Sequence, residues 1–213
     1  MKKVIIMLVA LIPVSGFAQD QGGASTLEQL VAKLDNATTV ADYEALESQF
    51  AALSATDNQW LPPYYAALCD ANIGFLLEKE GDRIERYSDR GLEQLKEARS
   101  RIDSATQRKE LAEVYVVASL LYRTKVFINP MTMGRKYGPT AGKYLELALK
   151  LDADNPRAVY VDAWNKYHTP KMWGGDKRLA KELAHKSLAL LAKEKPGVQP
   201  HWGARENKEL IND

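Results

Sequence analysis

Residues 91–98 read GLEQLKEA, and residues 141–148 read AGKYLELA. Each stretch places a small residue, a large one and a second small one at spacings of four and three. Those spacings bring the three residues to one face of a helix, where the small side chains let a second helix approach closely. Three such triplets occur, the last in a weaker form: Gly91–Leu95–Ala98, Ala141–Leu145–Ala148 and Ala180–Ala184–Ser187. They predict helices packed in pairs.

Apolar residues at helical spacing continue on both sides of these triplets, and no segment after residue 25 alternates with a convincing period of two. The predicted helices cover about residues 26–34, 43–53, 62–79, 82–102, 107–126, 140–151, 156–167 and 176–191. The helix over 107–126 is apolar on more than one face, so we expect neighbours to cover it on both sides. The fold class is therefore all-α, with hairpins stacked in layers.

Residues 148–156, which read ALKLDADNP, look like the end of one helical repeat and the start of the next. Here the sequence resembles the tetratricopeptide-repeat (TPR) family over roughly residues 60–192. The resemblance implies a right-handed α-solenoid of stacked antiparallel helix pairs. The triplets are spaced more widely than the family period of about 34 residues, and we place the excess in residues 127–138 and 169–175. Asp162 and Lys166 also stand where the family has apolar or small residues.

Residues 155–158, 169–176 and 200–203 are similar to the terminal arrangement of exported bacterial repeat proteins of this kind. Gly174 and Gly175 supply backbone angles that other residues adopt only at a cost. Trp173 and Trp202 are large apolar side chains in loops. We expect them to cap the open end of the last helix pair.

The first residues form a predicted Sec signal peptide. Lys2 and Lys3 precede an apolar run over 4–14, and small residues lead to a cleavage site after Ala18. The run is too short for a membrane span, which needs roughly 20 residues. The predicted organisation is a cleaved signal peptide (1–18), a flexible leader (19–25) and a single TPR-like domain (26–213) with a C-terminal cap (193–213). We therefore expect a periplasmic or secreted protein without a membrane anchor.

Composition and motifs restrict the classes of function that we expect for this chain. Lys plus Arg total 29 and Asp plus Glu total 28, which argues against a general nucleic-acid binder. A single cysteine, Cys69, excludes an intrachain disulfide, and we expect it to be a buried small hydrophobe. The sequence lacks zinc-hydrolase, serine-hydrolase and phosphate-loop motifs, and its three histidines are far apart. No catalytic residue, cofactor or metal site is expected.

Two sets of residues are candidates for partner binding. Residues 128–138 are interpreted as a long loop whose Arg135, Lys136 and Tyr137 could contact an acidic or peptide-like partner. Alternatively, the loop folds back over the preceding helix and buries Met131 and Met133. The TPR resemblance implies a groove for extended peptides, lined by Tyr115, Tyr122, Arg123, Arg157, Tyr160 and Trp164. The alternative is that these aromatic side chains pack between helix layers.

Three functions follow from these observations. The first is a non-catalytic adaptor or assembly module that binds a protein or peptide in the cell envelope. The second is a solute-binding component of an envelope transport system, and the third is an enzyme assembled from scattered residues. A groove open along its length would favour a partner protein, an enclosed cavity a solute, and clustered carboxylates or histidines catalysis.

Overall fold

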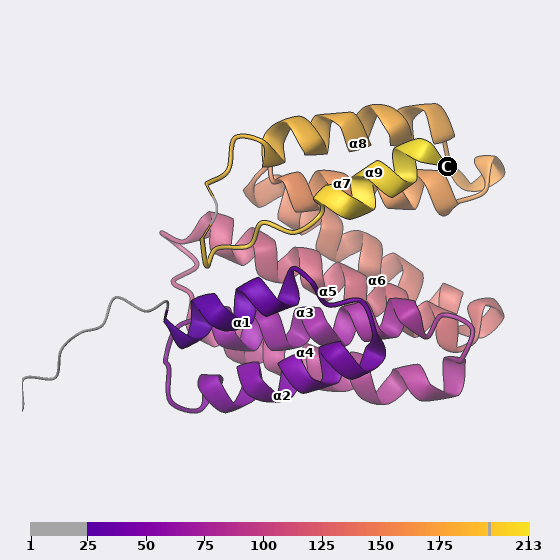
Figure 1. Ribbon diagram of the computed structural model, residues 1–213. Helices are drawn as coiled ribbons and strands as arrows, with labels where there is room; N and C mark the ends of the chain where they lie inside the picture. Colours follow the sequence, from indigo (N-terminus) through magenta and orange to yellow (C-terminus); the bar gives the residue numbers. More distant parts are fainter. Residues whose placement is uncertain (1–24, 196) are drawn as a thin grey trace, which may run out of the picture.

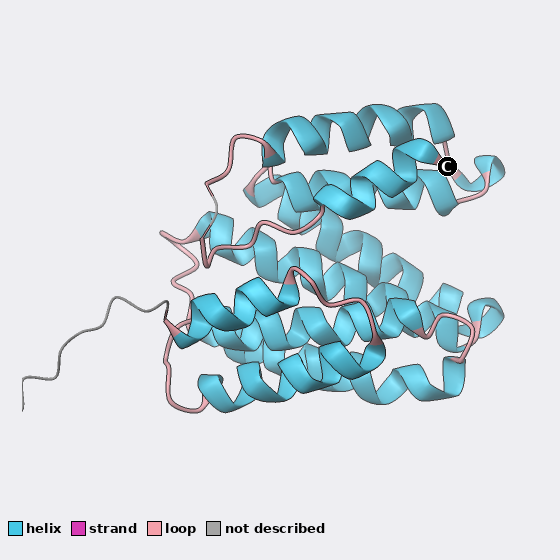
Figure 2. Cartoon of the chain, in the orientation of Figure 1, coloured by secondary structure: helices cyan, strands magenta, loops and turns pink. Residues whose placement is uncertain are grey.

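The computed structural model describes residues 25–195 and 197–213, and within them the chain is helical with no strand (Figure 2). This confirms the all-α class. The predicted signal peptide and nearly all of the leader lie outside the described residues. The helices are α1 (Thr26–Leu34), α2 (Val40–Ser54), α3 (Leu61–Leu76), α4 (Ile84–Ser100), α5 (Arg108–Ile128), α6 (Pro130–Leu151), α7 (Pro156–His168), α8 (Lys177–Leu191) and α9 (Ala204–Asn212), with short 3-10 turns η1 (Gly81–Arg83) and η2 (Lys171–Trp173).

Successive helices lie side by side and antiparallel (Figure 1). From α2 to α6 each helix packs against the next, and α7 packs against α8. In addition, α5 contacts both α3 and α7. The C-terminal ends of α3, α5 and α7 therefore share one end of the molecule, where α4, α6 and α8 begin.

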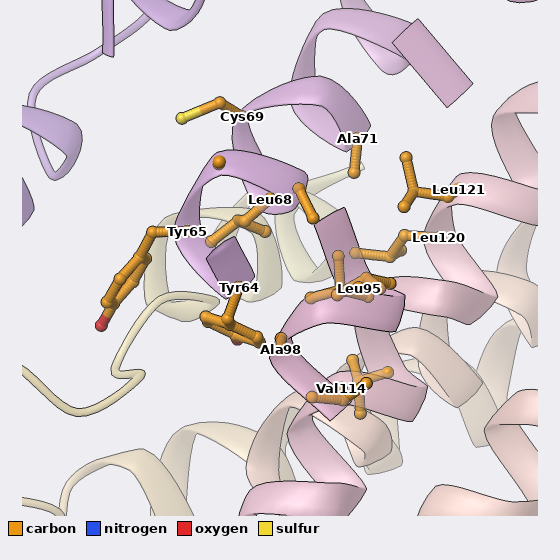
Figure 3. Close-up of a cluster of buried hydrophobic side chains, with 14 of the residues drawn as sticks. Tyr64, Tyr65, Leu68, Cys69, Ala71, Leu95, Ala98, Val114, Leu120 and Leu121 are labelled. Carbon is orange, nitrogen blue, oxygen red and sulfur yellow. The ribbon is translucent and has the colours of Figure 1, made fainter. Parts of the chain in front are cut away.

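The small residues of the triplets lie where helices come closest. The alanines of all three triplets are fully buried: Ala98, Ala141, Ala148, Ala180 and Ala184. At Gly91, a Cβ atom would lie 2.8 Å from a methyl group of Leu121 on α5, so only glycine fits there without a shift. Leu95 fills the core beside Ala98, in the cluster shown in Figure 3. The predicted role of the triplets as close-packing faces is confirmed.

Two further local predictions are confirmed. The predicted capping box opens α1, with the Glu28 amide donating to Ser25 Oγ at 3.2 Å and the Ser25 amide donating to Glu28 Oε2 at 2.6 Å. Cys69 lies fully buried on α3. Burial also raises the pKa of its thiol well above the usual value, so this group is unreactive.

The predicted loop over residues 128–138 is wrong. Helix α6 begins at Pro130, so α5 and α6 are joined by Asn129 alone, whose side chain caps α6. Pro139 lies inside α6, where it removes the hydrogen bond to the Arg135 carbonyl. Both residues are exposed, so water can satisfy that carbonyl. Packing of α6 along α5 outweighs the weak helix propensity of this stretch.

The expected C-terminal cap is also corrected. Trp173 is 73% exposed and covers nothing. Trp202 donates from Nε1 to Tyr64 Oη at 2.9 Å and meets the Tyr160 ring edge-on, so it bridges α3 and α7. The chain then forms α9, a helix the sequence pattern did not predict, which packs on α8 and α7.

Candidate functional site

Aromatic rings gather where α3, α5 and α7 end. Phe75 of α3 meets Phe127 of α5 at 5.6 Å and Trp164 of α7 at 5.5 Å, both edge-to-face. His168 continues the row, with its ring 4.2 Å from Trp164 and 5.2 Å from Tyr167. We call Phe75, Phe127, Trp164, Tyr167 and His168 the end cluster. The shared direction of α3, α5 and α7 assembles it from residues far apart in the sequence.

Arg123 supports the end cluster from α5. Its guanidinium lies 5.8 Å from the centre of the Trp164 ring and donates to Asn165 Oδ1 at 2.7 Å. Burial lowers the pKa of Arg123, which still leaves a cation at neutral pH. The contact holds Trp164 in place, so this part of the site is preorganised.

The same end of the molecule carries exposed hydrophobic side chains. Four large hydrophobic residues are exposed in the described part of the chain: Leu76 (48%), Met131 (83%), Met172 (81%) and Trp173 (73%). Each lies at the end of α3, at the start of α6 or in the connection from α7 to α8. Exposed apolar residues that gather at one end of a molecule indicate a binding surface.

The connection from α7 to α8 is rigidly built. Gly174 adopts a φ of +92°, as predicted for a glycine-dependent turn. A Cβ at Gly175 would lie 1.7 Å from the Thr169 carbonyl oxygen, so this position also requires glycine. The Asp176 amide donates to the Lys166 carbonyl at 2.9 Å and closes the loop. These backbone contacts fix the conformation of the turn, from which Met172 and Trp173 extend into solvent.

A cavity of about 680 Å³ opens between the end of α7, this connection and the start of α8. Tyr167 and His168 are the aromatic residues of its lining. Its remaining lining residues include three cations, Lys171, Lys177 and Arg178. Asp176 is the carboxylate of the lining, and it caps α8 by accepting from the Leu179 amide at 3.0 Å. The cavity therefore combines aromatic rings with cations, and Lys177 Nζ lies 4.3 Å from the centre of the Tyr167 ring.

His168 can offer a neutral imidazole to this cavity. Burial lowers its pKa below the usual value, against the opposing effect of Glu78 and Asp213. An imidazole with a lowered pKa is unprotonated at neutral pH and can donate a lone pair to a metal. Among the described residues, no group of three or more His, Cys, Asp and Glu side chains is placed to hold a free metal ion.

The partner-binding residues predicted from the sequence fall into three places. Trp164 belongs to the end cluster, and Arg123 lies against its ring. A second group contains Tyr115, Tyr122 and Tyr137, whose rings lie with that of Tyr144 between α4 and α6. Lys136 lies beside the Tyr137 ring, and the neighbouring Arg135 is exposed.

Arg157 and Tyr160 face the interior. Arg157 is buried and pairs with Glu113 at 2.8 Å and with Glu194 at 2.7 Å, so two carboxylates already satisfy its guanidinium. Tyr160 packs edge-on against Trp202. The TPR-implied groove is thus not one continuous surface here, because residues 198–203 of the chain itself lie across α3 and α7.

A second cavity, of about 230 Å³, lies under this C-terminal segment. Its polar lining groups largely pair with each other, with His201 Nε2 at 3.1 Å from Asp35 and Arg205 at 3.3 Å from Glu206. A site whose charges are already satisfied is a weaker candidate than the larger cavity at the end cluster.

The sequence pattern did not indicate Phe75, Phe127, His168 or Met172 as site residues, and it predicted a capping role for Trp173 that the structure does not show. Phe75 and Phe127 have ordinary core-like positions at helix ends, and nothing local shows that these ends meet. The adjacent Met172 and Trp173 in a glycine-containing loop were the available signal, since exposed apolar pairs in braced turns are typical of contact surfaces.

No family model matches this sequence, and no curated protein matches it. The fold is similar to the solved structure of the HusA haemophore from Porphyromonas gingivalis, with a TM-score of 0.76 and 28% sequence identity. The similarity covers 90% of this chain and 92% of that chain. In the described part of the chain, no helix has the length and apolar character needed to cross a bilayer.

Proposed function

We propose that this chain, like the haemophore it resembles, binds a haem-class tetrapyrrole and carries it as cargo outside the cytoplasm. The observation that carries the proposal is the gathering of exposed Leu76, Met131, Met172 and Trp173 around the end cluster. Similarity over nearly the whole of both chains supports it. On this proposal the protein binds its ligand without changing it chemically.

The chemistry of the site suits a planar ligand with an apolar body and carboxylate groups. Methionine and tryptophan side chains adapt to a flat macrocycle and bury its apolar faces. Lys171 and Lys177 line the adjoining cavity and would pair with the two propionates, whereas Arg178 of the same lining already pairs with Glu182 at 2.7 Å. His168 is the candidate iron ligand among the residues that line this cavity.

We further propose export by the predicted signal peptide and a TPR-like stacking of the helix pairs. The contacts of α5 with α3, α4, α6 and α7 support stacking, since a middle layer touches the layers on both sides. The adaptor role expected from the sequence stays a prediction, and the tyrosines between α4 and α6 are the observation that favours it.

The proposal is tested by titrating the purified chain with haemin and with iron-free protoporphyrin, following the Soret band and tryptophan fluorescence. Binding of both is expected, because most of the gathered side chains would contact the ring and its carboxylates, whereas only His168 would contact the iron. Met172→Ala/Trp173→Ala should weaken both titrations at least about tenfold. Both residues are exposed, so the double variant should keep its fold.

Tyr122→Ala/Tyr144→Ala serves as the matched control, since these rings lie away from the end cluster. Retention of tetrapyrrole binding by the Met172/Trp173 variant would overturn the assignment of the site. Absence of binding to the unaltered chain would overturn the function.

A further inference from the structure

Four tyrosines form a continuous row on another face of the molecule. Tyr115 and Tyr122 of α5 alternate with Tyr144 and Tyr137 of α6, and we call this row the tyrosine groove. Successive ring centres are 5.6 Å (Tyr115–Tyr144), 5.4 Å (Tyr144–Tyr122) and 6.1 Å (Tyr122–Tyr137) apart. Each pair on one helix is seven residues apart, which keeps both rings on the same face.

The groove has a floor and two walls. Tyr115, Ala118 and Tyr122 of α5 form the floor, with Tyr144 of α6 on one side. The other wall comes from α4 and consists of Leu92, Leu95, Lys96 and Arg99. The shallow hollow between them measures about 100 Å³, so the groove suits a ligand that lies along the surface.

These tyrosines differ from the buried ones. Tyr43, Tyr64, Tyr65 and Tyr87 are buried, and each hydroxyl donates a hydrogen bond within the fold. The groove tyrosines are half-buried instead. The hydroxyls of Tyr115, Tyr122 and Tyr144 have no hydrogen-bond partner among the described residues. Their rings and hydroxyls are therefore free to contact a ligand.

Cations stand at both ends of the row. The Arg99 guanidinium lies 5.9 Å from the Tyr115 ring at one end, and Lys136 Nζ lies 4.8 Å from the Tyr137 ring at the other. Neither cation forms an ion pair with any described residue. The carboxylates of α4 near the row are Asp89, which pairs with Lys125, Glu93, which pairs with Lys96, and Glu85, which acts electrostatically on Lys136 without pairing with it. The groove thus presents aromatic rings between unpaired positive charges.

We propose that the tyrosine groove binds an extended, acidic, proline-containing segment of a partner protein. The three ring-to-ring steps match about five residues of extended or polyproline chain, at about 3.1–3.3 Å per residue. The groove is built from helices, so it has no sheet edge for strand addition. Recognition must come from rings and hydroxyls, which is how aromatic-lined grooves hold polyproline segments. The end cations select acidic residues.

The probe is a fluorescein-labelled heptapeptide of alternating glutamate and proline, measured by fluorescence polarisation against the purified chain. A peptide with lysine in place of glutamate is the matched control. We expect the glutamate peptide to bind at least about tenfold more tightly than the lysine peptide, and less tightly as salt rises.

Tyr122→Ala/Tyr144→Ala should weaken binding of the glutamate peptide at least about tenfold. Arg99→Glu/Lys136→Glu alters only exposed side chains and should do the same without affecting the fold, as circular dichroism will verify. Met172→Ala/Trp173→Ala should leave peptide binding unchanged. This proposal is independent of tetrapyrrole binding, because different residues carry it.

The proposal would be overturned if the two peptides bound equally well or if the glutamate peptide did not bind. It would also be overturned if both groove variants bound the glutamate peptide as tightly as the natural chain. Loss of haemin binding in the groove variants, with competition between haemin and the peptide, would instead assign the groove to the tetrapyrrole and overturn a separate partner surface.

Discussion

Asp70 shows how a buried charge is held in this fold. Its carboxylate is fully buried on α3 and accepts from Arg90 Nε at 2.9 Å and Nη2 at 2.6 Å. Burial raises the pKa of Asp70 to about 6, although the hydrogen bonds from Arg90 lower it. An unfolded aspartate titrates near pH 4 (about 3.9). Between these values the folded chain therefore binds more protons than the unfolded chain.

The resulting pH dependence is a prediction for Asp70→Asn. The contribution of Asp70 to the free energy of unfolding should be largest below about pH 4 and decline as the pH rises to about 6. Urea unfolding of the natural chain and of Asp70→Asn at several pH values measures this contribution. The stability of the natural chain relative to Asp70→Asn should fall across this window, and a difference that stays constant would contradict the prediction.

Arg157 stabilises the interior through two ion pairs. Its guanidinium joins Glu113 of α5 to Glu194 after α8, while Tyr64 also donates to Glu113 at 3.3 Å. Arg157→Met should cost about 3–5 kcal/mol in the free energy of unfolding, because Glu113 would stay buried without its cation.

The control is the double variant Arg157→Met/Glu113→Gln, and a denaturant titration measures the stability of both variants. Removing both charges should restore part of the loss. A double variant that is less stable than Arg157→Met would show that the ion pair is not the source of the effect.

At the scale of elements, two glycines in helices that both pack on α5 behave in opposite ways. A Cβ at Gly142 on α6 would meet nothing within 4 Å, whereas a Cβ at Gly91 on α4 would meet Leu121 at 2.8 Å. Gly142→Ala should therefore raise the free energy of unfolding by up to about 1 kcal/mol, through helix propensity. Gly91→Ala should lower it by about 1–3 kcal/mol, through overpacking. The denaturant midpoints of the two variants measure these changes. If both substitutions changed the stability in the same direction, this explanation would be wrong.

Helix α6 shows why element boundaries escaped the sequence pattern. Residues 130–138 contain Gly134 and Gly138, which have low helix propensity, and Pro139 follows inside the helix. The stretch is helical because its side chains pack on α5, with Tyr137 beside Tyr122 and Val126 near Gly134. Such contacts depend on a neighbouring helix and leave no local signature.

At the scale of the whole molecule, the C-terminal segment joins parts that are distant in sequence. Tyr65 Oη donates to the Val198 carbonyl at 2.6 Å, and Trp202 bridges α3 and α7. Trp202→Ala should cost about 3 kcal/mol in the free energy of unfolding. Trp173→Ala, the matched change at an exposed position, should stay within about 0.5 kcal/mol. Thermal and urea unfolding compare the two variants, and similar losses would contradict the proposed roles.

The sequence by itself determined the helical class, the close-packing faces of the triplets, the capping box of α1 and the burial of Cys69. These features depend on residue spacing within one helix or one turn, which sequence order preserves. The tertiary structure alone decided that Phe75, Phe127, Trp164 and His168 meet at one end, that Arg157 is enclosed, and that the tyrosines of α5 and α6 alternate in one row. Those arrangements depend on which helices become neighbours, and that is set by packing across the whole chain.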